Sequence, residues 1–204
     1  AILERAGKIF PNVEIVSRRP DRQTMRSSYG EFYRRARRLA EALTRAGLRP
    51  GDRVATLMWN HVGHLETYFG VPVAGGVIHT LNLRLHPNEI AYIARHAEDR
   101  FLIVDDVLLP TYEKFREQVR FERVFVTSFG GQAVPPGGPR QAAVELESYE
   151  ALLATATGEF AYPTLDENAA AAMCFTSGTT GNPKGVLYSH RSLVLHSFAE
   201  ALVD

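Results

Sequence analysis

The sequence predicts an α/β fold, with a largely parallel sheet covered by helices on both faces. Three predicted strands are short and mostly apolar, which is typical of strands buried on both sides: 53–58, 77–80 and 101–104. Each of them is followed by a segment whose apolar residues recur at helical spacing. Strands that alternate with helices in this way favour parallel pairing through crossover helices.

The first thirty residues predict a helix followed by a strand pair. Residues 1–10 have the pattern of an amphipathic helix and lack that of a secretory signal. Residues 13–17 and 23–27 predict two short strands, and Pro20 and Asp21 between them are typical of a turn.

A long helix is predicted to follow this strand pair. Ser28 and Glu31 have the spacing of a capping box, and Gly47 suits the residue that ends a helix. The side of this helix opposite its apolar stripe carries arginines, which we interpret as a solvated face rather than a basic binding patch: Arg34, Arg35, Arg37, Arg38 and Arg45.

The rest of the chain continues the alternation. After strand 53–58, a helix is predicted from about His61 that kinks or ends at Pro72, followed by strand 77–80, a helix beginning at Pro87 and strand 101–104. Helix 109–119 and strand 123–127 come next, and then a Gly/Pro-rich crossing near 130–139. A short helix at 146–154 and a strand that begins near Ala169 complete the predicted elements. The elements indicate one α/β domain, and no internal repeat is present.

The composition is that of an ordinary globular protein. The 204 residues are 45% hydrophobic and 23% charged, and 23 Lys and Arg balance 23 Asp and Glu. This balance gives no support to a nucleic-acid surface, and no apolar run approaches the roughly 20 residues of a membrane span. The single cysteine cannot form an internal disulfide, which fits a cytoplasmic location.

The most informative stretch is C-F-T-S-G-T-T-G-N-P-K-G at residues 174–185, which contains four hydroxyls, three glycines and one lysine. Glycine lets the backbone approach a ligand closely, and hydroxyls, N–H groups and an ammonium group suit an anion such as phosphate. The alternative is a plain turn between two strands. We favour the anion-binding loop, because a turn does not need so many donors.

Two common phosphate-binding patterns do not fit this stretch. The Walker pattern requires Gly-Lys followed by Ser or Thr, whereas Lys184 lies between Pro183 and Gly185. Gly178 and Gly181 supply only part of the dinucleotide fingerprint, and a proline follows where a helix should continue.

Other polar residues are interpreted as structural. Asp105 and Asp106 end a predicted strand, where a metal site is one interpretation and a solvated turn is the one we favour. The histidines lack further ligands at metal-binding spacing, so we interpret them as structural, with His190 capping or packing the last helix: His61, His64, His86, His190 and His196. Core positions are predicted for Cys174, Trp59 and Tyr68.

Residues 176–185, T-S-G-T-T-G-N-P-K-G, resemble the phosphate loop of the adenylate-forming superfamily, which comprises acyl- and aryl-CoA synthetases, peptide-synthetase adenylation domains and firefly-type luciferases. Flanking segments resemble the medium- and long-chain fatty acyl-CoA synthetase branch: Gly51-Asp52-Arg53-Val54-Ala55, His79-Thr80-Leu81-Asn82, Glu89-Ile90-Ala91-Tyr92-Ile93, His96-Ala97-Glu98-Asp99-Arg100 and Val186-Leu187-Tyr188-Ser189-His190-Arg191-Ser192. The resemblance covers nearly the whole chain but only the first part of a typical member. We therefore interpret residues 1–204 as an incomplete N-terminal portion of the large AMP-binding domain, without the C-terminal domain.

The resemblance implies a two-step reaction. A fatty carboxylate attacks the α-phosphate of ATP to give acyl-adenylate and pyrophosphate, and the thiol of coenzyme A then takes the acyl group. The matching residues that would hold the ATP phosphates are Thr176, Ser177, Gly178, Thr179, Thr180, Gly181 and Lys184. Thr176 matches the position that helps to place Mg²⁺ on the phosphates.

The family's acidic magnesium partner, its ribose-binding aspartate and its adenylation lysine have no counterpart in these residues. No complete catalytic set is therefore present, and we expect the chain alone to be inactive. Two alternatives stay open: an adenylate-forming ligase for another acid or acceptor, and a non-catalytic α/β binding or assembly module. Long-chain members are able to dimerise through the N-terminal domain, which makes a homodimer a further implication.

Overall fold

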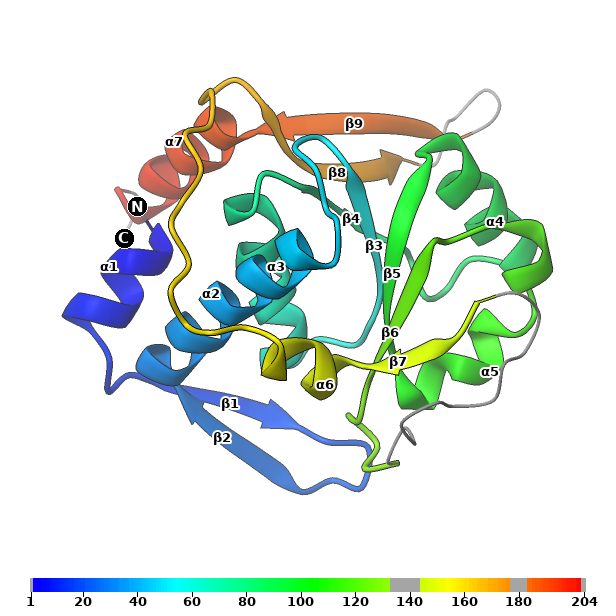
Figure 1. Ribbon diagram of the computed structural model, residues 1–204, viewed down its shortest axis with the longest axis horizontal. Coiled ribbons are helices and arrows are strands. Elements are labelled where there is room, and N and C mark those ends of the chain that lie inside the picture. Colours follow the sequence, from blue (N-terminus) through cyan, green and yellow to red (C-terminus); the bar gives the residue numbers. More distant parts are fainter. Residues whose placement is uncertain (1, 133–143, 177–182, 203–204) are drawn as a thin grey trace.

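The chain folds around a seven-stranded sheet in the order β7-β6-β5-β3-β4-β8-β9 (Figure 1). This computed structural model describes residues 2–132, 144–176 and 183–202, and the count of strands refers to those residues. The strands are β3 (Arg53–Leu57), β4 (Val77–Thr80), β5 (Asp99–Asp105), β6 (Arg123–Thr127), β7 (Leu146–Ser148), β8 (Ala170–Thr176) and β9 (Lys184–Ser189). All neighbours pair in parallel except β8 and β9, which are antiparallel, so the predicted largely parallel α/β fold is confirmed.

Helices cover both faces of this sheet (Figure 1). On one face lie α2 (Tyr29–Arg45), α3 (Val62–Val73) and α6 (Tyr149–Ala154), over a core that includes Leu39, Val54, Val71, Phe101 and Leu152. On the other face lie α4 (Pro87–His96) and α5 (Leu109–Tyr112), over a core that includes Ala55, Leu57, Ile90, Leu102 and Phe115. Val54 of β3 packs in the first core, whereas Ala55 and Leu57 pack in the second, which explains why this strand has apolar residues on both of its faces.

The N-terminal elements form as predicted, with strand bounds shifted by one residue. Helix α1 (Ile2–Ile9) packs on α2, and β1 (Glu14–Arg18) pairs antiparallel with β2 (Thr24–Ser28) in a separate sheet. At the start of α2, the Glu31 N–H donates to the Ser28 Oγ over 3.2 Å. The capping box is incomplete, because the Glu31 carboxylate accepts instead from the Ser27 hydroxyl over 3.0 Å.

Three glycine and proline positions determine where helices begin and end. Gly47 has a φ of +97°, as a residue that ends a helix in the left-handed region should. Helix α3 ends one residue after Pro72, and α4 starts at Pro87. His86 caps α4 through its Nδ1, which accepts from the Asn88 N–H over 3.3 Å, so a ring nitrogen here replaces the usual oxygen.

Two predicted boundaries are wrong. The helix expected at 109–119 is broken into a 3₁₀ turn at Asp106–Leu108, the short α5 and a second 3₁₀ turn at Arg116–Gln118. Residues 146–148 form strand β7, and only the residues from Tyr149 onward are helical. The edge position of β7 explains this change, because β6 offers it ladder hydrogen bonds that outweigh its local helical pattern. Strand β9 was not predicted.

The last helix, α7 (His190–Ala201), has no buried residue among those described. The Gly/Pro-rich crossing is described only at residues 130–132, and its remainder lies outside the described residues. Across the described segments, no helix has both the length and the apolar character that crossing a membrane requires.

Candidate functional site

The two ends of the predicted phosphate loop meet at the tip of the β8–β9 pair. Thr176 is the register partner of Lys184, and the Thr176 Oγ1 lies 3.5 Å from the Lys184 carbonyl oxygen, to which it donates. Both side chains are exposed. The intervening candidates lie outside the described residues: Ser177, Gly178, Thr179, Thr180 and Gly181.

The direction of β8 determines where this loop lies. Strand β8 runs parallel to β4 through the pairs Ile78–Ala172 and His79–Met173, so Thr176 lies at the carboxyl edge of the parallel sheet. This is the edge at which open α/β sheets bind their ligands. The position therefore agrees with a binding loop, although the loop also connects two antiparallel strands, as the plain-turn alternative supposed.

The described ends of the loop fit a nucleotide phosphate better than a metal held by the protein alone. The Lys184 ammonium forms no ion pair with the described residues, and Thr176, its register partner, is also exposed. No group of three or more His, Cys, Asp or Glu side chains in the described segments could hold a metal ion. Mg²⁺ that arrives on phosphate oxygens keeps several waters and needs only one or two protein oxygens, a role that a threonine hydroxyl fits.

Asp105 and Asp106 are buried, so the interpretation of a solvated turn is wrong. Their residues are 0% and 2% exposed, respectively. Asp105 accepts hydrogen bonds from the Trp59 N–H over 2.7 Å and the Thr127 hydroxyl over 2.6 Å, and its Oδ1 lies 2.9 Å from the His61 Nε2. This carboxylate therefore joins the ends of β3, β5 and β6.

Asp106 fixes the connection that leaves β6. Its carboxylate accepts from three backbone N–H groups, those of Val107 over 2.8 Å, Gly130 over 2.6 Å and Gln132 over 2.9 Å. Because these donors occupy both carboxylate oxygens, Asp106 acts as a loop anchor in this structure.

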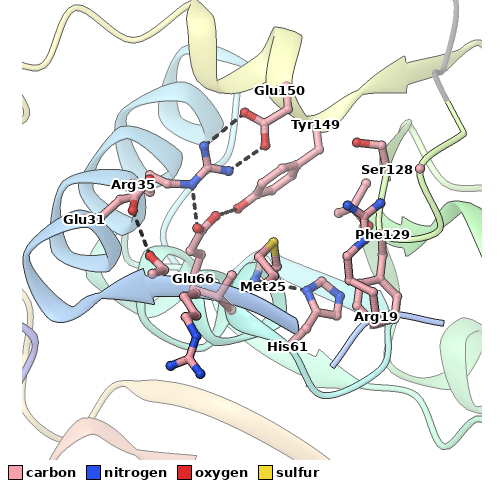
Figure 2. A pocket seen from close by; sticks show the side chains of 16 residues that line it. Arg19, Met25, Glu31, Arg35, His61, Glu66, Ser128, Phe129, Tyr149 and Glu150 are labelled. Carbon is pink, nitrogen blue, oxygen red and sulfur yellow. Dashed lines mark hydrogen bonds and ion pairs between the residues drawn. The ribbon is translucent and has the colours of Figure 1, made fainter. Parts of the chain in front are cut away.

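A cavity of about 520 Å³ lies next to these anchors, between the β1–β2 pair, α2, α3 and α6 (Figure 2). Its charged side chains neutralise one another. The Arg35 Nε lies 2.6 Å from the Glu66 Oε1, and the Arg35 guanidinium also pairs with Glu150 at 2.6 Å. The Tyr149 hydroxyl donates to Glu66 over 2.8 Å. We therefore interpret this network as one that packs α2, α3 and α6 together.

The network corrects the interpretation of the arginine face of α2. Arg35 is mostly buried, and burial raises the pKa of the Glu66 carboxyl against the opposing effect of Arg35. Arg37 donates to the Phe160 carbonyl oxygen over 2.7 Å, and its guanidinium lies over the rings of Tyr33 and Tyr162. Arg34 and Arg38 are exposed as predicted.

The structural interpretation of the α3 histidines agrees with their contacts. The His61 Nδ1 accepts from the Gly63 N–H over 3.1 Å and caps α3. The His64 Nε2 lies 3.0 Å from the Thr56 hydroxyl, and burial lowers the pKa of His64 to about 4. His190 is the first residue of α7, but Ser189 is the residue that caps this helix.

The core positions predicted for Cys174, Trp59 and Tyr68 are wrong. Trp59 is 48% and Tyr68 44% exposed, and Cys174 is exposed near the Thr80 hydroxyl, at 4.0 Å. Aromatic and sulfur-containing side chains need not be buried, because polarity indicates burial only on average.

Sequence reasoning also missed two groups of residues near the site. Strand β9 had a weak signal in its Val186-Leu187-Tyr188 run, which suits a strand. The buried contact between His79 and Asp99 had no signal in the sequence, because the two residues are far apart in sequence and their strands are separated by β3.

The fold and the loop ends together define an α/β protein with a candidate nucleotide-phosphate site at the carboxyl edge of its sheet. Residues 3–202 match the family model described as AMP-binding enzyme. The chain therefore belongs to the AMP-binding enzyme family.

Relatives of known function support this membership. The chain is 48% identical over 203 residues to a long-chain-fatty-acid–CoA ligase of Thermus thermophilus, a match that covers 99% of the chain and 35% of the relative. It is 44% identical over 209 residues to a 3-methylmercaptopropionyl-CoA ligase of Ruegeria lacuscaerulensis, covering 100% of the chain and 37% of the relative. The chain thus spans about a third of the length of the curated relatives it matches.

A solved structure supports the fold. The anthranilate CoA ligase AuaEII, in complex with anthranoyl-AMP, superposes with a TM-score of 0.80 at 24% identity, covering 96% of this chain and 35% of that one. At this identity the likeness shows the shared fold alone.

Proposed function

We propose that the protein is an adenylate-forming ligase that joins a medium- or long-chain fatty acid to coenzyme A at the expense of ATP. The observation that carries the proposal is the meeting of Thr176 and Lys184 at the carboxyl edge of the sheet, at the two ends of a glycine- and hydroxyl-rich loop. Membership of the AMP-binding family supports it.

The chemistry follows from the charges involved. When a carboxylate oxygen attacks the α-phosphorus of ATP, the bond to the β-phosphate oxygen breaks and negative charge grows on pyrophosphate. The Lys184 ammonium is proposed to stabilise that charge, because a cationic group held next to the leaving group lowers the energy of the transition state. The coenzyme A thiol then attacks the acyl carbonyl, and AMP leaves.

Mg²⁺ bound to the phosphates supplies further charge neutralisation, and the Thr176 hydroxyl is the residue proposed to contact it. Its exposure beside Lys184 leaves it accessible to a nucleotide. ATP and coenzyme A are abundant in the cytoplasm, which supports the expected cytoplasmic location.

The fatty-acid substrate is supported by the 48% identical long-chain relative and by a 41% identical medium-chain-fatty-acid–CoA ligase of Ectopseudomonas oleovorans. A second candidate is a ligase for another acid. The 44% identical 3-methylmercaptopropionyl-CoA ligase and a 33% identical 4-hydroxybutyrate–CoA ligase of Metallosphaera sedula favour this candidate.

The test is acid-dependent exchange of labelled pyrophosphate into ATP by the protein expressed from its complete gene. The acids are palmitate, octanoate, 3-methylmercaptopropionate, 4-hydroxybutyrate and benzoate. We expect exchange with octanoate or palmitate and a CoA thioester once coenzyme A is added. Preference for a short or aromatic acid would favour the second candidate, and exchange with none of them would contradict an adenylate-forming activity.

A further inference from the structure

A buried histidine–carboxylate pair lies on the α4 side of the sheet. The His79 Nδ1 of β4 is 2.9 and 2.7 Å from the two carboxylate oxygens of Asp99, at the start of β5, and both side chains are fully buried. The pair spans β3, which lies between β4 and β5. Burying such a pair costs desolvation energy that a well-packed apolar pair would not, so its presence suggests a role other than stability.

The His79 ring contacts the β8–β9 pair close to the end at which Thr176 and Lys184 lie. Strand β4 pairs His79 with Met173, and Phe175 lies two residues further along β8, on the same face. The Phe175 ring centroid is 5.2 Å from that of His79 and 5.8 Å from that of His96 on α4, the latter at 84°. Phe175 is therefore held in a corner between β4 and α4.

The other side of this ring contacts Gly185. Phe175 and Gly185 are register partners, and a Cβ added to Gly185 would lie 3.1 and 3.2 Å from two Phe175 ring carbons. The ring thus covers the Gly185 backbone, as aromatic side chains often do for a glycine on a neighbouring strand. A larger residue at 185 would push the ring or the strand away.

The chain places these contacts at both ends of the loop. Phe175 directly precedes Thr176, and Gly185 directly follows Lys184. The Phe175 ring therefore links the residue that precedes the loop to the residue that follows it.

We infer that His79 and Asp99 are positioning residues for the phosphate loop: they orient the His79 ring against Phe175, and Phe175 holds the ends of β8 and β9 in register. The kinetic part of this inference rests on the proposed function, whereas the structural part does not.

The experiment compares His79→Gln and Phe175→Leu with a matched control, Phe125→Leu. Phe125 is a fully buried aromatic residue of the same sheet, on β6 and away from the loop. Phe175→Tyr keeps the ring and serves as the conservative variant. All are made in the protein expressed from its complete gene, and Asp99→Asn replaces His79→Gln should that variant fail to fold.

Hydrogen–deuterium exchange is the ligand-independent measurement. We expect faster exchange in 170–176 and 184–189 for His79→Gln and Phe175→Leu, with β5 and β6 unchanged, and wild-type protection in Phe175→Tyr. Phe125→Leu should leave the β8–β9 pair protected. Unchanged protection of that pair, or equal loss throughout the sheet, would overturn the inference.

Pyrophosphate exchange is the kinetic measurement. We expect KM for ATP to rise about tenfold in His79→Gln and Phe175→Leu, because a slightly displaced loop holds the phosphates poorly, while KM for the acid stays constant at saturating ATP. Phe125→Leu should leave both values unchanged, and a rise in both KM values alike would overturn the inference. If wild-type protein shows no exchange with any acid while deuterium uptake responds as expected, the proposed function fails and the positioning of the β8–β9 pair stands.

Discussion

Lys184 lies directly opposite Thr176 in the antiparallel pairing of β8 with β9. The two residues are eight positions apart in the sequence. Both residues are exposed at the carboxyl edge of the sheet, and the proposed function depends on this placement.

Replacing Thr176 with alanine should weaken the response to Mg²⁺. In pyrophosphate exchange we expect the Mg²⁺ concentration for half-maximal activity to rise about tenfold, because one metal-directed oxygen is lost. Thr176→Ser keeps the hydroxyl and should respond like the wild type. Thr164→Ala removes an exposed threonine outside the loop and is the control. An unchanged Mg²⁺ titration for Thr176→Ala would argue against contact between this hydroxyl and the metal.

Replacing Arg35 with alanine should destabilise the protein strongly. The change leaves Glu66 buried without its cationic partner, and removal of one member of a buried pair costs about 3–5 kcal/mol. Arg38→Ala, on the exposed face of the same helix, should cost less than about 0.5 kcal/mol. Urea unfolding measures both changes, and similar midpoints for the two variants would show that the Arg35 network does not hold the helices together.

The protein should lose stability in acid partly through His64. Burial lowers the pKa of His64 from 6.5 to about 4, so between these pH values the unfolded chain binds a proton that the folded chain does not. The free energy of unfolding therefore falls as the pH falls through this window, by about 1.4 kcal/mol per pH unit and about 3 kcal/mol in all.

The variant His64→Gln lacks the titrating imidazole, so the pH-dependent part of the free energy of unfolding that comes from His64 should be absent. Comparing the pH profiles of the variant and the wild type separates this part from that of the other titrating groups. We expect the variant's free energy of unfolding, measured in urea between pH 7 and pH 4, to depend less on pH than that of the wild type. Parallel pH profiles for the two proteins would contradict a neutral buried His64.

The central sheet could be predicted because its strands carry their own signal. Val54, Ala55 and Leu57 of β3 and Phe101 to Val104 of β5 are apolar and fully buried, as expected for strands that are covered on both faces. Helix α2 was predictable at both ends from Ser28 and Gly47. The edge strands β7 and β9 were not, because an edge strand forms through pairing with a neighbour, and such pairing leaves little trace in a short sequence.

Candidate site residues could be predicted from the sequence only where they are contiguous. Residues 176–185 are contiguous, so their residue types were informative by themselves. The burial of Asp105 depends on donors from Trp59, His61 and Thr127, and that of Glu66 on Arg35 and Tyr149. Such groups meet only after the chain has folded, so sequence spacing gives no sign of them.

The most direct test of the central claim is Lys184→Ala, measured by pyrophosphate exchange in the protein expressed from its complete gene. Lys114→Ala, which removes an exposed lysine distant in sequence from the loop, is the matched control. We predict that Lys184→Ala lowers kcat/KM for ATP by about 100-fold or more, because a preorganised charge on the leaving group is lost, while its unfolding midpoint matches that of Lys114→Ala. Equal exchange activity in the two variants would contradict a role for Lys184 in holding the ATP phosphates.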